Sequence, residues 1–334
     1  MKISVGVIGL GYWGPNYLRN FYRQEQTEVV WGCDSSEAVL AKTHRAYPYL
    51  KLSKNYQELI NDSKLDCIAV ATPPKNHFKI VKESLLAGKH VLVAKPMATN
   101  SFDAQELLKI AKKKNLLLHG DLTYLYSGAV KSIKNMITGN IIGKPLYFDS
   151  IRTNAGPIRD DASVIWDLAP HDLSIIDFLF NFAPKKIIAV GSRHYKNSTM
   201  EEMAHISINY SNNFVAHIHL SWLSPVKLRM ISIGGTSKMV FFDDVQMDEK
   251  VKIYDNKTNI PNEEITPFKP FYRSGNIIIP KLENEEALFL EIKDVVNQIA
   301  RKKKDYQNSK LNIKIIKLLE ACDQSLKKNQ AINL

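Results

Sequence analysis

The chain has 334 residues, which is enough for two domains that each bury a well-developed core. Its apolar and charged fractions, 45% and 24%, are typical of globular proteins, and no apolar run approaches the roughly twenty residues that span a bilayer. Although the formal net charge is +11, no nucleic-acid recognition motif accompanies it, so we expect neither nucleic acid nor a membrane as a partner.

The start of the chain and its cysteines bear on the cellular compartment. The first residues have a strand pattern rather than the apolar segment of a signal peptide, so we expect a cytoplasmic protein. Cys33, Cys67 and Cys322 are too few and too scattered for a disulfide framework or a zinc site, and we expect the first two to be small core residues. The basic run at residues 301–304 is predicted to be a solvated helix end, and a positive surface would also attract an anionic small molecule such as a nucleotide sugar.

A glycine-rich turn follows the first predicted strand, residues 3–8. Gly9, Gly11 and Gly14 complete the pattern G-x-G-x-x-G, and residues 13–22 are predicted to form a helix. Gly9 permits the tight turn, Gly11 lets the backbone approach a pyrophosphate, and Gly14 lets the helix pack close to the strand. The N–H groups at the helix start favour the negative charge of phosphates. The alternative is an ordinary strand–helix turn without a ligand.

An acidic residue ends the second predicted strand, residues 28–33. Asp34 lies about twenty residues beyond Gly14, where the dinucleotide fingerprint has its carboxylate. This carboxylate would accept hydrogen bonds from an adenosine ribose and repel a 2′-phosphate. We therefore expect NAD as the cofactor in preference to NADP.

Strand and helix patterns alternate as far as residue 122. The near-continuous apolar run at residues 65–71 is typical of a parallel strand that is buried on both faces. The alternation predicts an α/β domain over residues 1–122, a Rossmann domain with a doubly wound parallel sheet. Ligands of such sheets bind outside the carboxyl ends of the strands. The other predicted elements are helices at residues 37–46, 56–60, 75–87 and 101–113 and strands at residues 90–93 and 116–118. The helix at residues 101–113 is predicted to have Asn100 or Ser101 as its N-cap.

Longer strands replace this alternation after residue 122. Residues 204–210 and 214–220 alternate strictly, and Ser211–Asn213 between them predicts an antiparallel hairpin. We expect an α+β domain over residues 123–334 with an open, mostly antiparallel sheet, whose C-terminal helices are free to pack back on the first domain. The other predicted elements are a helix at residues 128–137, strands at residues 146–152, 186–190, 228–233 and 238–242, a turn at Gly234–Gly235, and helical structure from residue 283 onward.

A lysine directly follows the buried strand at residues 90–93, at the ligand-binding edge. Pro96 restricts Lys95 to extended geometry and is itself compatible with a cis peptide bond. A lysine in this position can donate a hydrogen bond to a substrate hydroxyl, or lose its proton if burial lowers its pKa. The alternative is a surface lysine at a strand end.

Two polar residues are spaced by four in a third stretch, residues 166–173. Asp167 is a good helix N-cap and Pro170 suits a first helical turn, so Asp167 and His171 are predicted to share one helix face. The positive end of the helix dipole would oppose protonation of His171 and keep it able to accept a proton. The alternative is a structural Asp–His pair within a helix.

Taken together, these stretches resemble the Gfo/Idh/MocA oxidoreductases, a family of sugar and inositol dehydrogenases with a Rossmann domain and an open-faced α+β domain. The resemblance covers essentially the whole chain and rests on Gly9–Asn16, Ala71–Pro74 with His77, Ala87–Pro96 and Trp166–Asp172. The Gly-Tyr-Trp-Gly-Pro-Asn and Trp-Asp-x-x-x-His-Asp segments look most like the branch that oxidises UDP-linked amino-sugar uronates and related sugars.

The resemblance implies roles for individual residues. Lys95 matches the lysine that contacts the reacting hydroxyl and the nicotinamide side, and His171 matches the catalytic acid/base. Asp167 matches the acid that binds substrate or orients that histidine, and Tyr126 lies where the chain crosses between the domains. The implied cofactor-binding residues are Gly9, Gly11, Tyr12, Trp13, Gly14, Asp34, Ser35, Ala71, Thr72, Pro73, His77, Lys95, Thr123 and Trp166.

One residue departs from the family pattern. Ala94 stands where the family's Glu-Lys-Pro motif has its glutamate. A carboxylate there would stabilise the charged lysine, so its loss favours deprotonation of Lys95 and removes an anchor. The departure favours a non-catalytic NAD-binding sensor, whereas Lys95 with Asp167 and His171 favours an enzyme.

The expected function is hydride transfer between nicotinamide and a sugar ring carbon. The resemblance points to C3 of a nucleotide-linked sugar or sugar uronate, such as a UDP conjugate. The alternatives are a dehydrogenase of a free sugar or inositol and the sensor on the same fold.

Three histidines in the hairpin strands are predicted to lie on one sheet face. His217 and His219 are two residues apart and point the same way, and His205 can join them. A metal site is one interpretation. We favour a polar face or a subunit interface, because no carboxylate or cysteine joins the histidines at ligand spacing. Members of the family often pair through this open sheet, so the resemblance implies a homodimer or homotetramer.

Overall fold

The computed structural model describes residues 2–156, 162–195, 199–255, 275–301 and 304–334. It divides into two compact units. The first comprises Met1–Tyr126 with Glu285–Glu320, and the second comprises Ser127–Asn284 with Ala321–Leu334. The predicted boundary lies at residue 122, with C-terminal helices free to pack back on the first domain, and in the structure Glu285–Glu320 belongs to the first unit.

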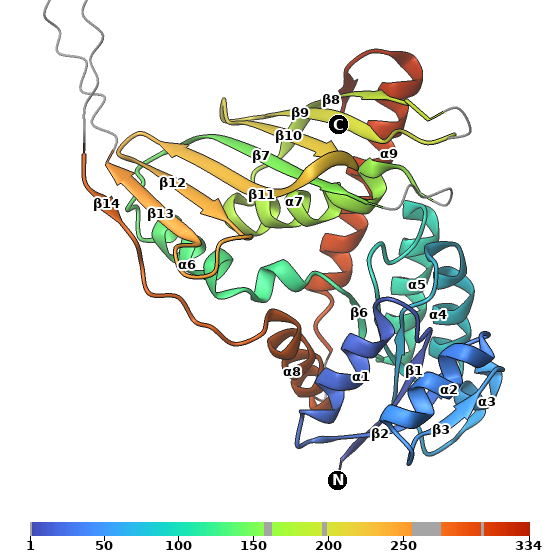
Figure 1. The fold of residues 1–334 in the computed structure, drawn as a ribbon. Helices are drawn as coiled ribbons and strands as arrows, with labels where there is room; N and C mark the ends of the chain where they lie inside the picture. Colours follow the sequence, from blue (N-terminus) through green and yellow to red (C-terminus); the bar gives the residue numbers. More distant parts are fainter. Residues whose placement is uncertain (1, 157–161, 196–198, 256–274, 302–303) are drawn as a thin grey trace, which may run out of the picture. The chain divides into compact units, whose positions relative to one another are not determined.

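The first unit has a six-stranded sheet in the order β3-β2-β1-β4-β5-β6, with every pair parallel (Figure 1). This confirms the predicted doubly wound Rossmann sheet, whose strand order reverses between β1 and β4. The strands are β1 (Ile3–Ile8), β2 (Thr27–Cys33), β3 (Lys51–Ser53), β4 (Cys67–Val70), β5 (His90–Val93) and β6 (Leu118–Gly120). The helices are α1 (Gly14–Tyr22), α2 (Glu37–Ala46), α3 (Tyr56–Asn61), η1 (Pro74–Asn76), α4 (His77–Leu86), α5 (Ser101–Lys114), η2 (Thr123–Tyr126), α8 (Ala287–Ala300) and the first part of α9 (Gln307–Lys328).

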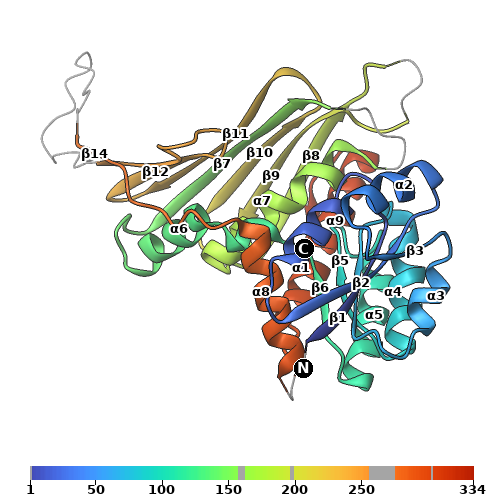
Figure 2. The same cartoon turned by 60° about the horizontal axis from the view of Figure 1, so that its bottom comes forward.

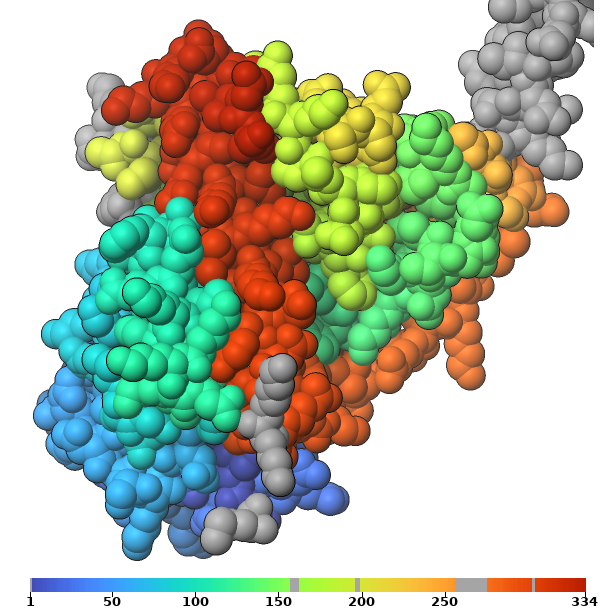
Figure 3. Space-filling view, turned by 180° about the vertical axis from the view of Figure 1, so that it is seen from behind, coloured from blue at the N-terminus to red at the C-terminus, as the bar shows by residue number. Residues whose placement is uncertain are grey.

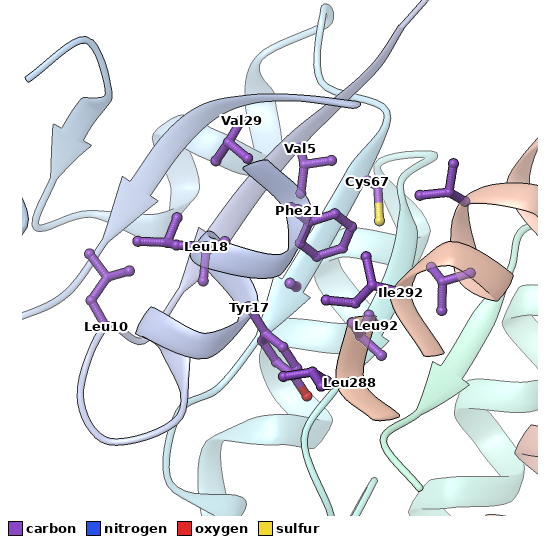
Figure 4. Close-up of a cluster of buried hydrophobic side chains, with 14 of the residues drawn as sticks. Val5, Leu10, Tyr17, Leu18, Phe21, Val29, Cys67, Leu92, Leu288 and Ile292 are labelled. Atoms are coloured by element: carbon purple, nitrogen blue, oxygen red, sulfur yellow. The ribbon is translucent and has the colours of Figure 1, made fainter. Parts of the chain in front are cut away.

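The core of the first unit explains why α8 belongs to it. Val5 of β1, Phe21 of α1 and Ile292 of α8 are fully buried in one cluster (Figure 4). α8 adds Leu288 and Val295 at helical spacing, so its apolar stripe packs against the same core. The sheet and α1 therefore obtain part of their hydrophobic cover from residues far along the chain.

The first part of α9 packs beside α5 in the same unit, as the space-filling view shows (Figure 3). The Ser101 N–H donates to Glu320 Oε1 over 2.7 Å, and the Tyr306 hydroxyl donates to the Ala111 carbonyl over 3.3 Å. Of the two predicted cap residues, Asn100 is the N-cap of α5, and its side chain accepts the Asp103 N–H.

The second unit has a nine-stranded sheet in the order β14-β13-β12-β11-β7-β10-β9-β8-β15. β7 and β10 pair in parallel and all other neighbours pair antiparallel, which confirms a mostly antiparallel sheet and the β9–β10 hairpin. Two helices, α6 and α7, lie on one face of it (Figure 2). The elements are α6 (Gly128–Thr138), β7 (Pro145–Ala155), α7 (Val164–Phe180), β8 (Pro184–Ser192), β9 (Met203–Tyr210), β10 (Val215–Ser221), β11 (Leu223–Gly235), β12 (Lys238–Asp243), β13 (Val251–Asp255), β14 (Ile277–Ile278) and β15 (Ile332–Asn333).

Two local predictions for the second unit were wrong. Gly234 and Gly235 are the last residues of β11 rather than a turn, and the chain turns at residues 236–237. A Cβ on Gly234 would lie 2.0 Å from the ring of Tyr147, so this glycine accommodates a cross-strand tyrosine. The N-cap of α7 is Ser163 and not Asp167, because Val164 and Ile165 are buried within an earlier first turn.

The basic run after α8 also differs from the prediction of a solvated helix end. Lys304 is buried, and its Nζ donates to the carbonyls of Gln298, Ile299 and Arg301. It therefore satisfies carbonyls at the end of α8. Lys302 and Lys303 lie outside the described residues. None of the described helices is both long enough and apolar enough to cross a membrane.

Candidate active site

The glycine-rich turn joins β1 to α1, and two of its three glycines have no room for a Cβ. Gly9 has φ +90°, and a Cβ there would lie 2.6 Å from the Ala71 carbonyl carbon. A Cβ on Gly14 would lie 1.9 Å from the Gly9 oxygen, so the helix starts in contact with the turn. Beside Gly11 the space is open within 4 Å. This is the cradle that a dinucleotide pyrophosphate needs at a helix N-terminus.

Asp34 is held at the end of β2 by main-chain donors. Its Oδ2 accepts the Leu10 N–H and its Oδ1 accepts the Ser36 N–H, at 2.8 and 2.9 Å. The carboxylate is thereby fixed beside the glycine-rich turn, and its remaining lone pairs suit two ribose hydroxyls. Ser35 is exposed at the same strand end. These residues fit NAD.

A buried histidine ties together the loops that follow β4 and β5. His77 is fully buried, and its Nε2 and Nδ1 lie 2.7 and 2.8 Å from the carbonyl oxygens of Thr72 and Pro96. Burial lowers the pKa of His77, and a neutral imidazole donates to only one of the two carbonyls. His77 thus fixes the loop next to Lys95.

Lys95 is half-buried directly after β5, and its peptide bond to Pro96 is cis. The preceding Ala94 packs against the core cluster of the first unit. Its N–H donates to the Val70 carbonyl of β4 over 2.8 Å, so Lys95 follows the last residue tied to the sheet. Lys95 therefore stands at the carboxyl edge, where ligands of this fold bind.

Asp167 and His171 lie one turn apart on α7, in the second unit. Both side chains are half-buried, whereas Leu168 and Asp172 next to them are buried. The Trp222 indole donates to Asp167 Oδ2 over 3.3 Å, which fixes the carboxylate. The shared helix face is confirmed, and its exposure suits a proton-transferring pair.

The dipole argument for His171 does not hold. α7 begins at Val164, so His171 is in its third turn rather than its first, and Pro170 lies inside the helix. The effect of the dipole falls off within the first turn. The helix dipole therefore gives no reason to assign His171 a neutral imidazole.

The predicted site residues lie in both units. Tyr12 is 94% exposed at the glycine-rich turn. The Trp166 indole of the second unit donates to Asp323 Oδ2 over 2.8 Å. The predicted cofactor-binding residues in the first unit are Gly9, Gly11, Tyr12, Trp13, Gly14, Asp34, Ser35, Ala71, Thr72, Pro73, His77, Lys95 and Thr123, and Trp166 belongs to the second with Asp167 and His171.

Sequence reasoning missed a buried acidic pair in the first unit, Asp121 and Glu291. Asp121 accepts hydrogen bonds from Trp13 and Thr123, two predicted cofactor-binding residues, and Glu291 also contacts Thr123. The sequence held one sign of this pair. Glu291 is a charged residue within the apolar stripe of α8, beside Leu288 and Ile292, which indicates a buried carboxyl group.

The three sheet histidines share one face, as predicted. His205 and His219 stack at 4.3 Å between ring centroids, and with His217 and Asp149 they line a hollow of about 320 Å³. Burial and the neighbouring His205 lower the pKa of His219. Within the described ranges, no three His, Cys, Asp or Glu side chains are arranged to hold a metal ion.

The fold and the glycine-rich turn with Asp34 define an NAD-binding protein of the Rossmann class, and sequence comparison gives the family. The model described as "Oxidoreductase family, NAD-binding Rossmann fold" matches residues 3–121, and the "GFO/IDH/MocA C-terminal domain" matches residues 130–241. The protein belongs to the Gfo/Idh/MocA family of NAD-binding oxidoreductases.

Individual relatives are distant. The chain is 26% identical to the uncharacterized oxidoreductase YdgJ of Escherichia coli, over 85% of this chain and 82% of the relative. It is 26% identical to the inositol 2-dehydrogenase/D-chiro-inositol 3-dehydrogenase of Lactiplantibacillus plantarum, over 60% and 59% of the two chains. An uncharacterized oxidoreductase of Streptococcus pneumoniae is matched over 60% of its own length at 24% identity.

Solved structures share the whole fold. GenD2 from gentamicin A biosynthesis, in complex with NAD, has a TM-score of 0.84 at 18% identity, covering 100% of this chain and 96% of that one. UDP-N-acetylglucosamine 3-dehydrogenase GnnA from Acidithiobacillus ferrooxidans has a TM-score of 0.82 at 20% identity, covering 98% and 99%.

Proposed function

We propose that the protein transfers a hydride between NAD and a ring carbon of a sugar. The proposed substrate is a nucleotide-linked sugar or sugar uronate, with C3 as the reacting carbon. The observation that carries the proposal is the half-buried Asp167–His171 pair on α7, in a chain that also has an NAD-binding turn. A protein that only senses NAD needs no paired proton acceptor. The fold similarity to GnnA, named a UDP-N-acetylglucosamine 3-dehydrogenase, supports this substrate class.

The proposed roles follow from the chemistry of each side chain. Oxidation breaks a C–H bond and the O–H bond of the same carbinol. Bound NAD supplies the hydride acceptor. His171 takes the hydroxyl proton, Asp167 orients the imidazole, and Lys95 donates to the hydroxyl oxygen and stabilises its developing negative charge. In the reductive direction His171 returns the proton.

Two other functions have specific support. The relative from Lactiplantibacillus plantarum is named an inositol dehydrogenase, which favours a free cyclitol or sugar as substrate. Ala94, in place of the glutamate of the family motif, favours a sensor that binds NAD without turnover.

Absorbance of reduced nicotinamide tests these functions directly. The purified protein is mixed with NAD, or NADP as the comparison, and with UDP-sugars, UDP-sugar uronates, free sugars and inositols; the corresponding keto-sugars are tested with NADH. We expect NAD-dependent turnover with a nucleotide-linked sugar. Turnover only with a free sugar or inositol would reassign the substrate class, and tight NAD binding without turnover in either direction would support the sensor.

We further propose that the protein is a homodimer or homotetramer that pairs through the histidine-bearing face of the nine-stranded sheet. Ile151, Ile188 and Val190 on this face are 36%, 40% and 57% exposed, and apolar surface of this kind favours association. Val190→Lys is expected to reduce the mass found by sedimentation equilibrium. Val245→Lys, at a 46% exposed valine between β12 and β13, is the control and should leave the mass unchanged. A monomeric wild type would contradict the proposal.

A further inference from the structure

Asp121, at the carboxyl end of β6, links the start of α1 to the rest of the first unit. It is 5% exposed. Its Oδ2 accepts from the Trp13 indole at 2.7 Å and the Tyr17 hydroxyl at 2.9 Å. Its Oδ1 accepts from the Thr123 N–H at 3.1 Å and contacts the Thr123 hydroxyl at 2.5 Å. This donor set suits an ionised carboxylate. Because Trp13 is the N-cap residue of α1, Asp121 fixes the helix start that follows the glycine-rich turn.

The hydrogens in this network can be counted. The Thr123 hydroxyl has one hydrogen but contacts two carboxyls, Asp121 Oδ1 at 2.5 Å and Glu291 Oε2 at 2.9 Å. One of the two contacts therefore needs a proton on a carboxyl group. Asp121 already accepts from three other donors, so the proton belongs on Glu291 Oε2. Glu291 donates to Thr123, and Thr123 donates to Asp121.

The surroundings of Glu291 agree with this count. Glu291 is fully buried, and burial followed by the charge of Asp121 raises its pKa to about 7, against the lowering effects of His119 and of the Leu122 N–H. Its Oε1 accepts the Leu122 N–H at 2.8 Å and lies 3.1 Å from His119 Nε2. The titratable groups around it are Tyr17 on α1, His119 on β6, Asp121, Tyr126 on η2 and Asp294 on α8. Burial and the nearby carboxyls raise the pKa of both tyrosines, so they stay neutral.

We propose that the proton shared by Glu291, Thr123 and Asp121 controls NAD binding, and that its loss weakens the hold of the glycine-rich turn on the cofactor. Without it, two buried carboxylates compete for the single Thr123 hydrogen and repel each other. The hydrogen bonds from Trp13 and Tyr17 to Asp121 then weaken. These bonds fix the start of α1, which is expected to bind the pyrophosphate. The added negative charge near that helix start also disfavours an anionic ligand.

Calorimetry of NAD binding to the full-length protein between pH 6.0 and 8.5 tests the proposal. We expect the Kd of the wild type to rise about tenfold over this range, because Glu291 should lose its proton more readily in the free than in the NAD-bound protein. Glu291→Gln keeps a neutral donor to Thr123 and should give a Kd that stays low at every pH. Glu58→Gln makes the same change of charge at an exposed residue of α3 and should retain the wild-type pH dependence.

Proton uptake provides a second readout that needs no variant. Because NAD is expected to favour protonated Glu291, binding at pH 7.5 should take up a fraction of a proton, measured in buffers of different ionisation enthalpy. A pH-independent Kd with no proton uptake in the wild type would overturn the proposal, as would a Glu291→Gln protein with the wild-type pH dependence.

Discussion

Replacing His171 with alanine is expected to lower kcat by about 10²–10⁴-fold, which is the usual contribution of a positioned acid/base. The Kd for NAD should remain nearly unchanged, because the glycine-rich turn and Asp34 belong to the other unit. Stopped-flow or steady-state absorbance at the reduced-nicotinamide band gives kcat, and calorimetry gives the Kd.

His205→Ala is the matched control for His171→Ala. It removes an imidazole from the same unit, on strand β9 rather than on α7, and should retain wild-type kcat. Added imidazole is expected to restore part of the activity of His171→Ala and to have no effect on the control. Wild-type turnover by His171→Ala would exclude His171 from proton transfer.

The first unit could be predicted closely because its signals are local. The turn from Gly9 to Gly14, the buried strand β4 and the cap of α5 each occupy a few consecutive residues. The predicted α2 has the bounds found in the structure. The short edge strand β3 was missed, since three residues carry too little of a period-two pattern.

Features that depend on distant contacts could not be predicted. A Gly-Gly pair is typical of a turn, yet Gly234 belongs to β11, where it packs against the ring of Tyr147. Ser163 and Asp167 are both residue types that cap helices well. Ser163 is the N-cap of α7 because Val164 and Ile165 are buried in the first turn of the helix. The same holds for the candidate site. Lys95 and His171 could be predicted because they lie in local sequence motifs, whereas Asp121 and Glu291 come together from positions 170 residues apart.

Breaking the buried ion pair between Arg152 and Asp172 is expected to have the largest effect on stability. Arg152 of β7 donates from Nε and Nη2 to the two oxygens of Asp172 on α7, both at 3.0 Å, with side-chain exposures of 3% and 0%. Asp172→Ala leaves a buried guanidinium without this carboxylate and should lower the free energy of unfolding by about 3–5 kcal/mol. Urea unfolding followed by circular dichroism measures the change.

A matched control and a double variant separate this effect from general damage to α7. Asp248→Ala, at an exposed residue after β12, should change the stability by less than about 0.5 kcal/mol. Arg152→Met combined with Asp172→Leu removes both charges of the pair at similar volume. It should regain most of the stability because neither partner is left as a buried charge without the other. A single Asp172→Ala variant as stable as wild type would contradict the argument. The Arg152–Asp172 ion pair joins α7 to β7 at the residue that directly follows His171. The position of the proposed acid/base is therefore expected to depend on Asp172, which takes no part in the chemistry.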